Sequence, residues 1–300
     1  MRYNEIHTHY TVKALAMIEI PYDLVQSYRA KTFRSLPGLR LRSREEAVDF
    51  VRQRGFVYFW PIGRTVMPSL WTAVAGDRPV ADEHDDPGHV TWGWKDALLG
   101  SRAWYYAKVL RKKSTMISFE VLPYFYALSE NYGAYEEDYL TQYEQGKLTL
   151  EAKLIYEALL DKGPLDTVEL RRAARMSSPG SEGRFNRALA DLQADFKILP
   201  VGVTQSGAWH YAFAYDLTAR HYPELPEQAH AIRETDARQT LALCYLRSVG
   251  ACQMRDLTYL FGWRAPEAER VVQVLAAQGH LQTGARIERQ TGEWIALSVW

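Results

Sequence analysis

The sequence is poor in the features that mark secreted, membrane and metal-binding proteins. It has only two cysteines, Cys244 and Cys252, which are too few for a disulfide framework or a cysteine zinc site. No uninterrupted apolar run reaches the roughly 18 residues that a membrane span needs, and residues 1–10 are polar and charged. We therefore expect a cytoplasmic protein with no membrane segment, no metal and no cofactor.

The chain also lacks a net charge, because its 36 Lys and Arg residues equal its 36 Asp and Glu residues. Any affinity for nucleic acid must then come from local segregation of charge and not from bulk attraction. Positive side chains do concentrate in the stretches 29–64, 102–113 and 171–187, whereas acids gather at 81–86 and 130–144. The sequence thus allows basic surfaces on a neutral protein.

The composition that is present is ordinary for a globular protein. Hydrophobic residues make up 47% and charged residues 24% of the chain, which argues against a largely disordered protein. The 300 residues are enough for two or three domains, because single cores usually stop growing near ~250 residues. We expect a mainly helical α+β protein with small β-hairpins.

The clearest pattern lies between residues 146 and 227. Three amphipathic helical periods are followed by two alternating, strand-like runs around a hairpin tip at 205–207. This order predicts a winged helix, a helix-turn-helix variant whose third helix faces DNA. The helices are expected at 150–160, 167–175 and 182–196, and the strands at 198–203 and 208–215.

The same order repeats in residues 228–300, after a linker at 221–228 that contains prolines. Two copies of one order of elements predict tandem winged helices. The helices are expected at 236–249, 253–260 and 266–278, and the strands at 281–288 and 294–300.

Residues 1–145 predict a helical region with a degenerate third winged helix. Ser43 caps the clearest of its helices, with Glu46 three residues further on, as in a capping box. The helices are expected at 21–31, 44–54, 67–75, 94–111 and 118–131, with a strand at 56–62.

Four stretches resemble the AlkZ/YcaQ family of bacterial DNA glycosylases. They are GWKD at 93–96, YYAKVLRKK at 105–113, PYFYALS at 123–129 and YDLTARHYP at 215–223. The resemblance implies three tandem winged helices arranged as a concave scaffold that grips duplex DNA. It also implies excision of bulky alkylated bases and unhooking of interstrand crosslinks.

The catalytic motif of that family is a triplet, Gln-x-Gln or Gln-x-Asp, after a Gly-hydrophobic-hydrophobic step. Here the step is 55–57 and the triplet is Tyr58-Phe59-Trp60. Hydrolysis of an N-glycosidic bond calls for an amide or a carboxylate, and neither a phenol nor an indole supplies one. Tyr58 and Trp60 match the catalytic positions of the family. Strand alternation is expected to place both on one face with Phe56, where they could pack in the core or stack on displaced bases instead.

The other candidate site residues are expected to contact DNA. The positive side chains suit phosphate contact better than base reading, and the hairpin-tip residues could enter a minor groove. The candidates are Arg64, Arg111, Lys112, Lys113, Arg171, Arg172, Arg175, Arg184, Arg187, Trp209 and His210.

Two charged stretches predict structural roles instead. Residues 82–89 carry metal-type side chains, but their Asp-Pro-Gly sequence is typical of a hydrated turn. At the start of the helix expected at 266–278, Glu267 and Glu269 balance Arg264 and Arg270. The last winged helix is therefore expected to support the structure more than it grips phosphate.

Three functions remain open at this point. The first is a DNA-repair protein that recognises damaged or distorted double-stranded DNA, and either excises bases through a rearranged site or has lost catalysis. The second is a non-enzymatic winged-helix DNA-binding or regulatory protein. The third is a winged-helix module that binds proteins and has no role on DNA.

Overall fold

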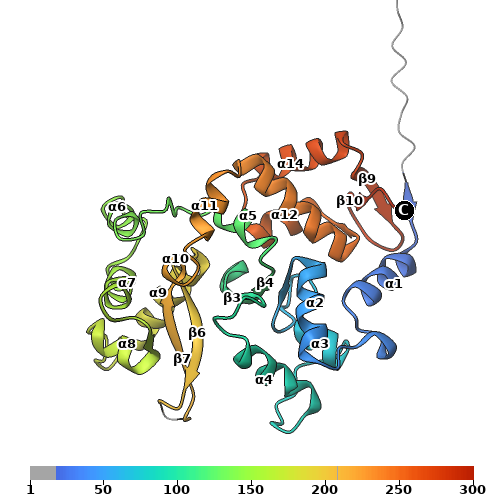
Figure 1. Cartoon of the computed structure of the whole chain (residues 1–300). Helices are drawn as coiled ribbons and strands as arrows, with labels where there is room; N and C mark the ends of the chain where they lie inside the picture. The colour runs from blue at the N-terminus through green and yellow to red at the C-terminus, as the bar shows by residue number, and fades with distance from the viewer. Residues whose placement is uncertain (1–17, 208) are drawn as a thin grey trace, which may run out of the picture.

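The computed structural model describes residues 18–207 and 209–300. Its helices alternate with small sheets (Figure 1), so the predicted α+β class is confirmed. None of the helices in these ranges is both long and apolar enough to cross a bilayer. The expectation for residues 1–10 and the start of the strand expected at 208–215 lie outside the described residues.

One order of elements, helix–strand–helix–helix–strand–strand, occurs three times in the described chain, and we call these the first, second and third units. The first unit comprises α2 (Arg44–Arg54), β2 (Phe56–Tyr58), α3 (Leu70–Ala75), α4 (Val90–Ala97), β3 (Tyr105–Lys108) and β4 (Ser114–Ile117). The second comprises α7 (Leu150–Lys162), β5 (Leu165–Asp166), α8 (Thr167–Ala173), α9 (Glu182–Ala194), β6 (Ile198–Thr204) and β7 (Ala212–Leu217). The third comprises α12 (Glu234–Val249), β8 (Ala251–Cys252), α13 (Met254–Phe261), α14 (Ala265–Ala277), β9 (Leu281–Ile287) and β10 (Trp294–Leu297).

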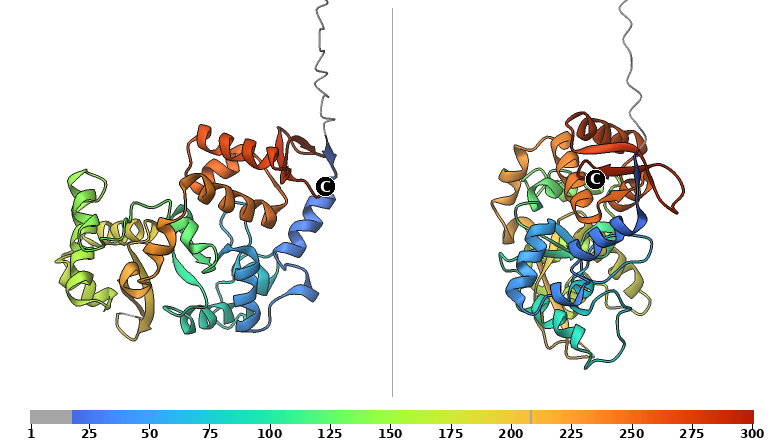
Figure 2. Two further views of the ribbon diagram at one scale, coloured as in Figure 1. Left: turned by 45° about the horizontal axis from the view of Figure 1, so that its top comes forward. Right: turned by 90° about the vertical axis from the view of Figure 1, so that its right-hand side faces the viewer.

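Shorter elements precede and connect the units. They are β1 (Glu19–Ile20), α1 (Tyr22–Thr32), the 3-10 turns η1 (Pro37–Leu39), η2 (Pro87–His89) and η3 (Leu110–Lys112), and the helices α5 (Leu122–Tyr126), α6 (Asp138–Glu144), α10 (Thr218–His221) and α11 (Leu225–His230). Figure 2 (left) shows the second unit extending to one side of the first and third.

Each unit builds its sheet in the same way. The last two strands form an antiparallel hairpin, and the first strand of the unit pairs with the last one. The strand orders are β2-β4-β3, β5-β7-β6 and β1-β9-β10-β8, where β1 adds to the third sheet in parallel with β9. The three units therefore share a topology as well as an order of elements.

The helices of the second and third units were predicted well because their caps are local. The Asp166 side chain accepts hydrogen bonds from the first turn of α8, and Glu169 reaches back to the Asp166 N–H, which makes a capping box. In the first unit, Ser43 caps α2 as predicted, although Glu46 bonds to the N–H of Arg42 and not to that of Ser43. The strand expected at 208–215 begins only at Ala212.

The prediction for the rest of the first unit is wrong in several elements. The helix expected at 94–111 is the end of α4, a loop and then β3, because Gly100 adopts φ +66° and the strand pairs with β4. An added Cβ at Gly100 would also lie 2.7 Å from the carbonyl oxygen of Val201. The strand expected at 56–62 stops at Tyr58, and the helices expected at 67–75 and 118–131 shorten to α3 and α5.

The first and third units share a hydrophobic core. One face of the first sheet, with Val57 and Met116, packs under α2 and α3. The opposite face, with Phe56, Tyr105 and Ile117, lies in one cluster with buried leucines of α12, α13 and α14. The second unit has a cluster of its own, built mainly on α7, α8 and α9. The first and third units are thus joined in space although they are far apart in sequence.

Candidate nucleic-acid interface

The turn between β3 and β4 presents three cations at the junction of the units. Arg111 and Lys112 adopt φ of 54° and 55°, a left-handed conformation that residues other than glycine adopt mainly in turns. Both side chains and that of Lys113 are exposed. The Arg111 guanidinium lies 4.4 Å from the ring centre of Tyr259 on α13, and Lys112 forms an ion pair with Asp191 on α9. The turn is therefore held between the second and third units.

Helix α9 carries a row of charged side chains toward that turn. Arg184, Arg187 and Asp191 follow one another at spacings of three and four residues, so they lie on one face of the helix. Both arginines are exposed, and Arg184 pairs with Glu151 on α7 at 3.2 Å. Because Asp191 binds Lys112, the row continues into the β3–β4 turn, and the structure brings these candidates together.

The other predicted cations are placed less uniformly. Arg171 is partly structural, because its Nε donates to the Met176 carbonyl at 3.3 Å and its guanidinium lies 5.7 Å from the Phe185 ring centre. Arg172 and Arg175 are exposed at and just beyond the end of α8. Arg64 is exposed in the loop between β2 and α3. We therefore assign Arg171, which is half-buried, a packing role.

The tip of the β6–β7 hairpin presents an exposed indole. The Trp209 side chain is 90% exposed and His210 beside it is exposed as well. Tyr211, the next residue, anchors the tip to the first unit, because its hydroxyl accepts a hydrogen bond from Lys95 at 2.8 Å and donates to Asp96 at 2.9 Å. The hairpin tip thus has a fixed support on α4.

Lys95 itself is a buried charge that the sequence did not reveal as important. Its side chain is 1% exposed and its ammonium lies 2.7 Å from the Asp96 carboxylate. The rings of Trp92 and Phe213 lie 4.4 and 4.5 Å from the ammonium. Burial lowers the pKa of Lys95, and the Asp96 carboxylate opposes that shift. No sequence pattern indicates that a lysine here meets a ring from residue 213.

Tyr58 and Trp60, which we expected to match the family's catalytic positions, do not meet in one site. Tyr58 is fully buried in the core that the first and third units share, and burial raises its pKa to about 12. Its hydroxyl has no hydrogen-bond partner among the residues described. At neutral pH this phenol is therefore uncharged and shielded from solvent.

Trp60 corrects our expectation that it shares a strand face with Tyr58 and Phe56. It packs instead in the cluster on the opposite side of the sheet, with ring centres 5.4 Å from Trp71 and 5.8 Å from Trp92. The reason is that β2 ends at Tyr58, so strand alternation does not continue to Trp60. The structure therefore separates the two side chains.

Residues 82–89 form a turn, as expected. The Asp86 carboxylate accepts a hydrogen bond from the Gly88 N–H at 2.7 Å and pairs with Arg78 at 2.6 Å. Within 18–207 and 209–300, no group of three or more His, Cys, Asp or Glu residues is placed to hold a metal ion.

Comparisons with known proteins point to one family. The family described as AlkZ related matches residues 41–262. No curated protein matches the chain. Among solved structures, the DNA glycosylase AlkZ of Streptomyces sahachiroi is similar, with a TM-score of 0.54 and 13% sequence identity, over 94% of this chain and 71% of that one. At this identity the likeness shows a shared fold, and together with the family match it confirms the predicted resemblance. The chain belongs to the AlkZ-related family.

Proposed function

We propose that this chain is a tandem winged-helix protein that binds double-stranded DNA and recognises damaged or distorted duplex. Each unit has the three helices and the hairpin that a winged helix requires, and α9 is then the DNA-facing third helix of the second unit. The observation that carries the proposal is the row on α9 with the exposed Arg184 and Arg187, which meets the β3–β4 turn through the ion pair of Asp191 with Lys112. Such a row suits successive phosphates on a duplex.

Two further features support this arrangement. The exposed Trp209 at the β6–β7 tip is suited to enter a groove, where aromatic or apolar side chains act as wedges. On α14, the third helix of the third unit, Arg264 at the N-cap pairs with Glu267 at 2.6 Å. Because this ion pair neutralises the positive charge of Arg264 at the start of α14, a structural role suits the third unit better than phosphate binding.

Salt dependence tests the binding proposal against the protein-interaction alternative. The logarithm of the affinity for duplex DNA should fall linearly with the logarithm of salt concentration, with a slope of about −0.9 for each phosphate neutralised. Binding that is absent or insensitive to salt would instead favour a module that binds proteins.

Base excision is the finer question, and the family membership and the AlkZ-like fold favour a role in repair. A specific observation favours the non-enzymatic alternative, because the buried Tyr58 and the clustered Trp60 supply neither an amide nor a carboxylate. Incubation with duplex that carries N7-alkylated or crosslinked guanine, followed by alkaline cleavage, decides between them. Strand scission shows excision, and scission that survives Tyr58→Phe with Trp60→Phe places the active site elsewhere. DNA binding without scission supports a non-enzymatic protein.

A further inference from the structure

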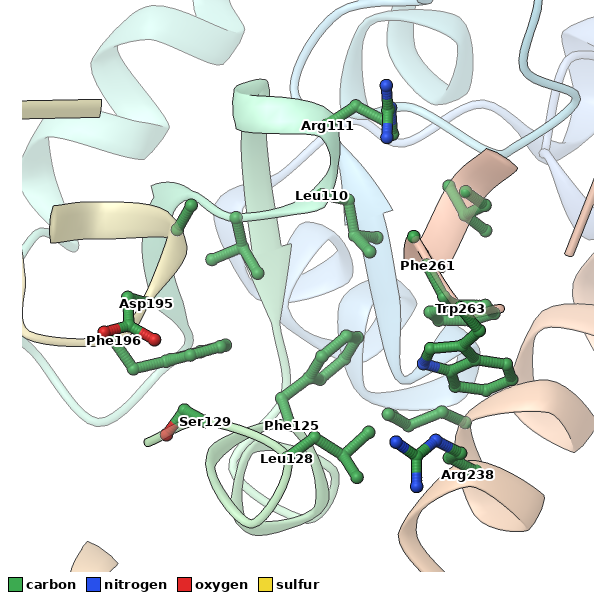
Figure 3. Close-up of a pocket in the computed structure, with 15 residues that line it drawn as sticks. Leu110, Arg111, Phe125, Leu128, Ser129, Asp195, Phe196, Arg238, Phe261 and Trp263 are labelled. Carbon is green, nitrogen blue, oxygen red and sulfur yellow. The ribbon is translucent and has the colours of Figure 1, made fainter. Parts of the chain in front are cut away.

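A cavity of about 240 Å³ lies where the three units meet. Its wall comes from the β3–β4 turn, the C-terminal ends of α5, α9 and α13, and one face of α12. Figure 3 shows Phe261, Trp263 and Arg238 on one side, Asp195 and Phe196 on the other, and Phe125 between them. The volume falls below the roughly 300–1,000 Å³ of sites for drug-sized ligands, so the cavity suits a single ring system.

Two stacked rings form one wall of this cavity. Phe261 and Trp263 lie with ring centres 4.3 Å apart and planes at 13°. Gly262 between them adopts φ +73°, a left-handed conformation that ends α13 and returns the chain so that both rings lie together. Both rings are only half-buried. A flat, partly open aromatic surface of this kind binds other planar rings by stacking.

Polar groups stand at both ends of the apolar middle. The Arg238 guanidinium pairs with Glu234 at 2.6 Å through Nη1, but its buried Nε has no partner in the described part of the chain. A guanidinium has five N–H donors and the Glu234 carboxylate occupies only part of them, so this side of the cavity suits a ligand with an acceptor. At the other end the Asp195 carboxylate lies 3.3 Å from the Lys197 ammonium, which also donates to Asn131 at 2.7 Å. That carboxylate is an acceptor for an amino group.

We infer that this cavity receives a single nucleobase displaced from duplex DNA. A nucleobase is a planar ring with acceptors and donors on its edges, which matches the stacked wall, Arg238 and Asp195. Arg111 lines the same cavity, and Lys112 and Lys113 follow it in the β3–β4 turn. DNA phosphates bound by these three cations would place a displaced base next to the cavity. The inference rests on the proposed DNA binding, and it assigns recognition of the base to residues outside the triplet 58–60.

The test compares three duplexes of one sequence: fully paired, with one unpaired base, and with an abasic site in place of that base. The abasic duplex keeps the distortion and removes the ring. We expect the full-length protein to bind the duplex with the unpaired base at least about fivefold more tightly than the abasic one, as stacking of one base predicts. Trp263→Ala should lose this preference and keep its affinity for fully paired duplex, whereas Trp263→Phe should retain it.

A matched control is Tyr132→Ala, which removes an exposed aromatic side chain outside this cavity and should leave the preference unchanged. Equal affinity of the wild-type protein for the base-bearing and abasic duplexes would overturn the cavity inference and leave DNA binding intact. Loss of binding to all three duplexes in a folded Trp263→Ala variant would also overturn the cavity inference, because Trp263 would then contact the DNA backbone and not a displaced base. Absence of any DNA binding by the wild-type protein would remove both proposals.

Discussion

The Lys95 ammonium lies 2.8 Å from the hydroxyl oxygen of Tyr211, and this contact joins α4 of the first unit to the β6–β7 hairpin of the second. Asp96 completes the joint, at 2.7 Å from Lys95 and 2.9 Å from Tyr211. The hairpin tip that carries Trp209 is therefore anchored to the ion pair of Lys95 with Asp96.

We expect Lys95→Met to destabilise the protein by about 3 kcal/mol, at the low end of the range for breaking a buried ion pair, because Asp96 keeps some contact with water. The free energy of unfolding in urea measures this. Lys147→Met is the control, since it breaks an exposed pair with Glu130 and should leave the urea midpoint unchanged. A Lys95→Met variant as stable as the wild type would show that the buried pair does not hold the joint.

The stability of the fold should fall in alkaline solution, in part through Tyr58. Burial raises the pKa of Tyr58 from 10.0 to about 12, so the folded chain keeps a proton that the unfolded chain has lost. The contribution of Tyr58 to the free energy of unfolding is therefore fully present below pH 10. It is lost as the pH rises from 10 to about 12, and the total loss is about 3 kcal/mol at most.

Tyr58→Phe tests this assignment because it has no phenolic proton to lose. The variant should be at least as stable as the wild type at neutral pH, since the Tyr58 hydroxyl has no partner among the described residues. Between pH 10 and 12 its free energy of unfolding should fall less steeply than that of the wild type. Parallel curves for the two proteins in urea titrations would contradict the assignment.

The second and third units could be predicted from the sequence because their signals are local. Helical periods, a cap such as Asp166 and turn residues lie within a few positions of the elements they define. The first unit could not, because residues 105–108 become a strand only by pairing with β4, and Trp60 turns away once β2 ends. Tertiary pairing overrides local periodicity in such segments.

The candidate interface was predicted in part for the same reason. The arginines of α9 follow from helical spacing, so Arg184 and Arg187 could be placed on one face in advance. The contact between Lys112 and Asp191 joins residues 79 positions apart, and sequence periodicity cannot predict a contact over that separation. The cavity wall likewise combines Asp195 and Trp263 from different units.

Arg187→Gln should weaken binding to duplex DNA and lower the salt slope by about 1, as loss of one phosphate contact predicts. Arg270→Gln is the matched control, because Arg270 is exposed on the corresponding helix of the third unit, α14. Arg184→Gln should have a smaller effect than Arg187→Gln, since Glu151 already balances that charge. Equal slopes for the Arg187 and Arg270 variants would argue against α9 as the DNA-facing helix.

Trp209→Ala should lower the affinity for duplex DNA by roughly 1–3 kcal/mol if the indole stacks against a base or enters a groove. Its thermal stability should not change, because the Trp209 side chain is 90% exposed. Fluorescence anisotropy with labelled duplex measures the affinity. An unchanged affinity would remove the hairpin tip from the interface.

The core shared by the first and third units has a consequence for biosynthesis. The sheet β2-β4-β3 leaves the ribosome before the second unit, whereas the helices α12, α13 and α14 that cover one of its faces emerge after it. During the intervening elongation Phe56, Tyr105 and Ile117 lack their final cover. A nascent chain that pauses in the second unit would therefore expose an aggregation-prone surface and call for a chaperone until the third unit is made.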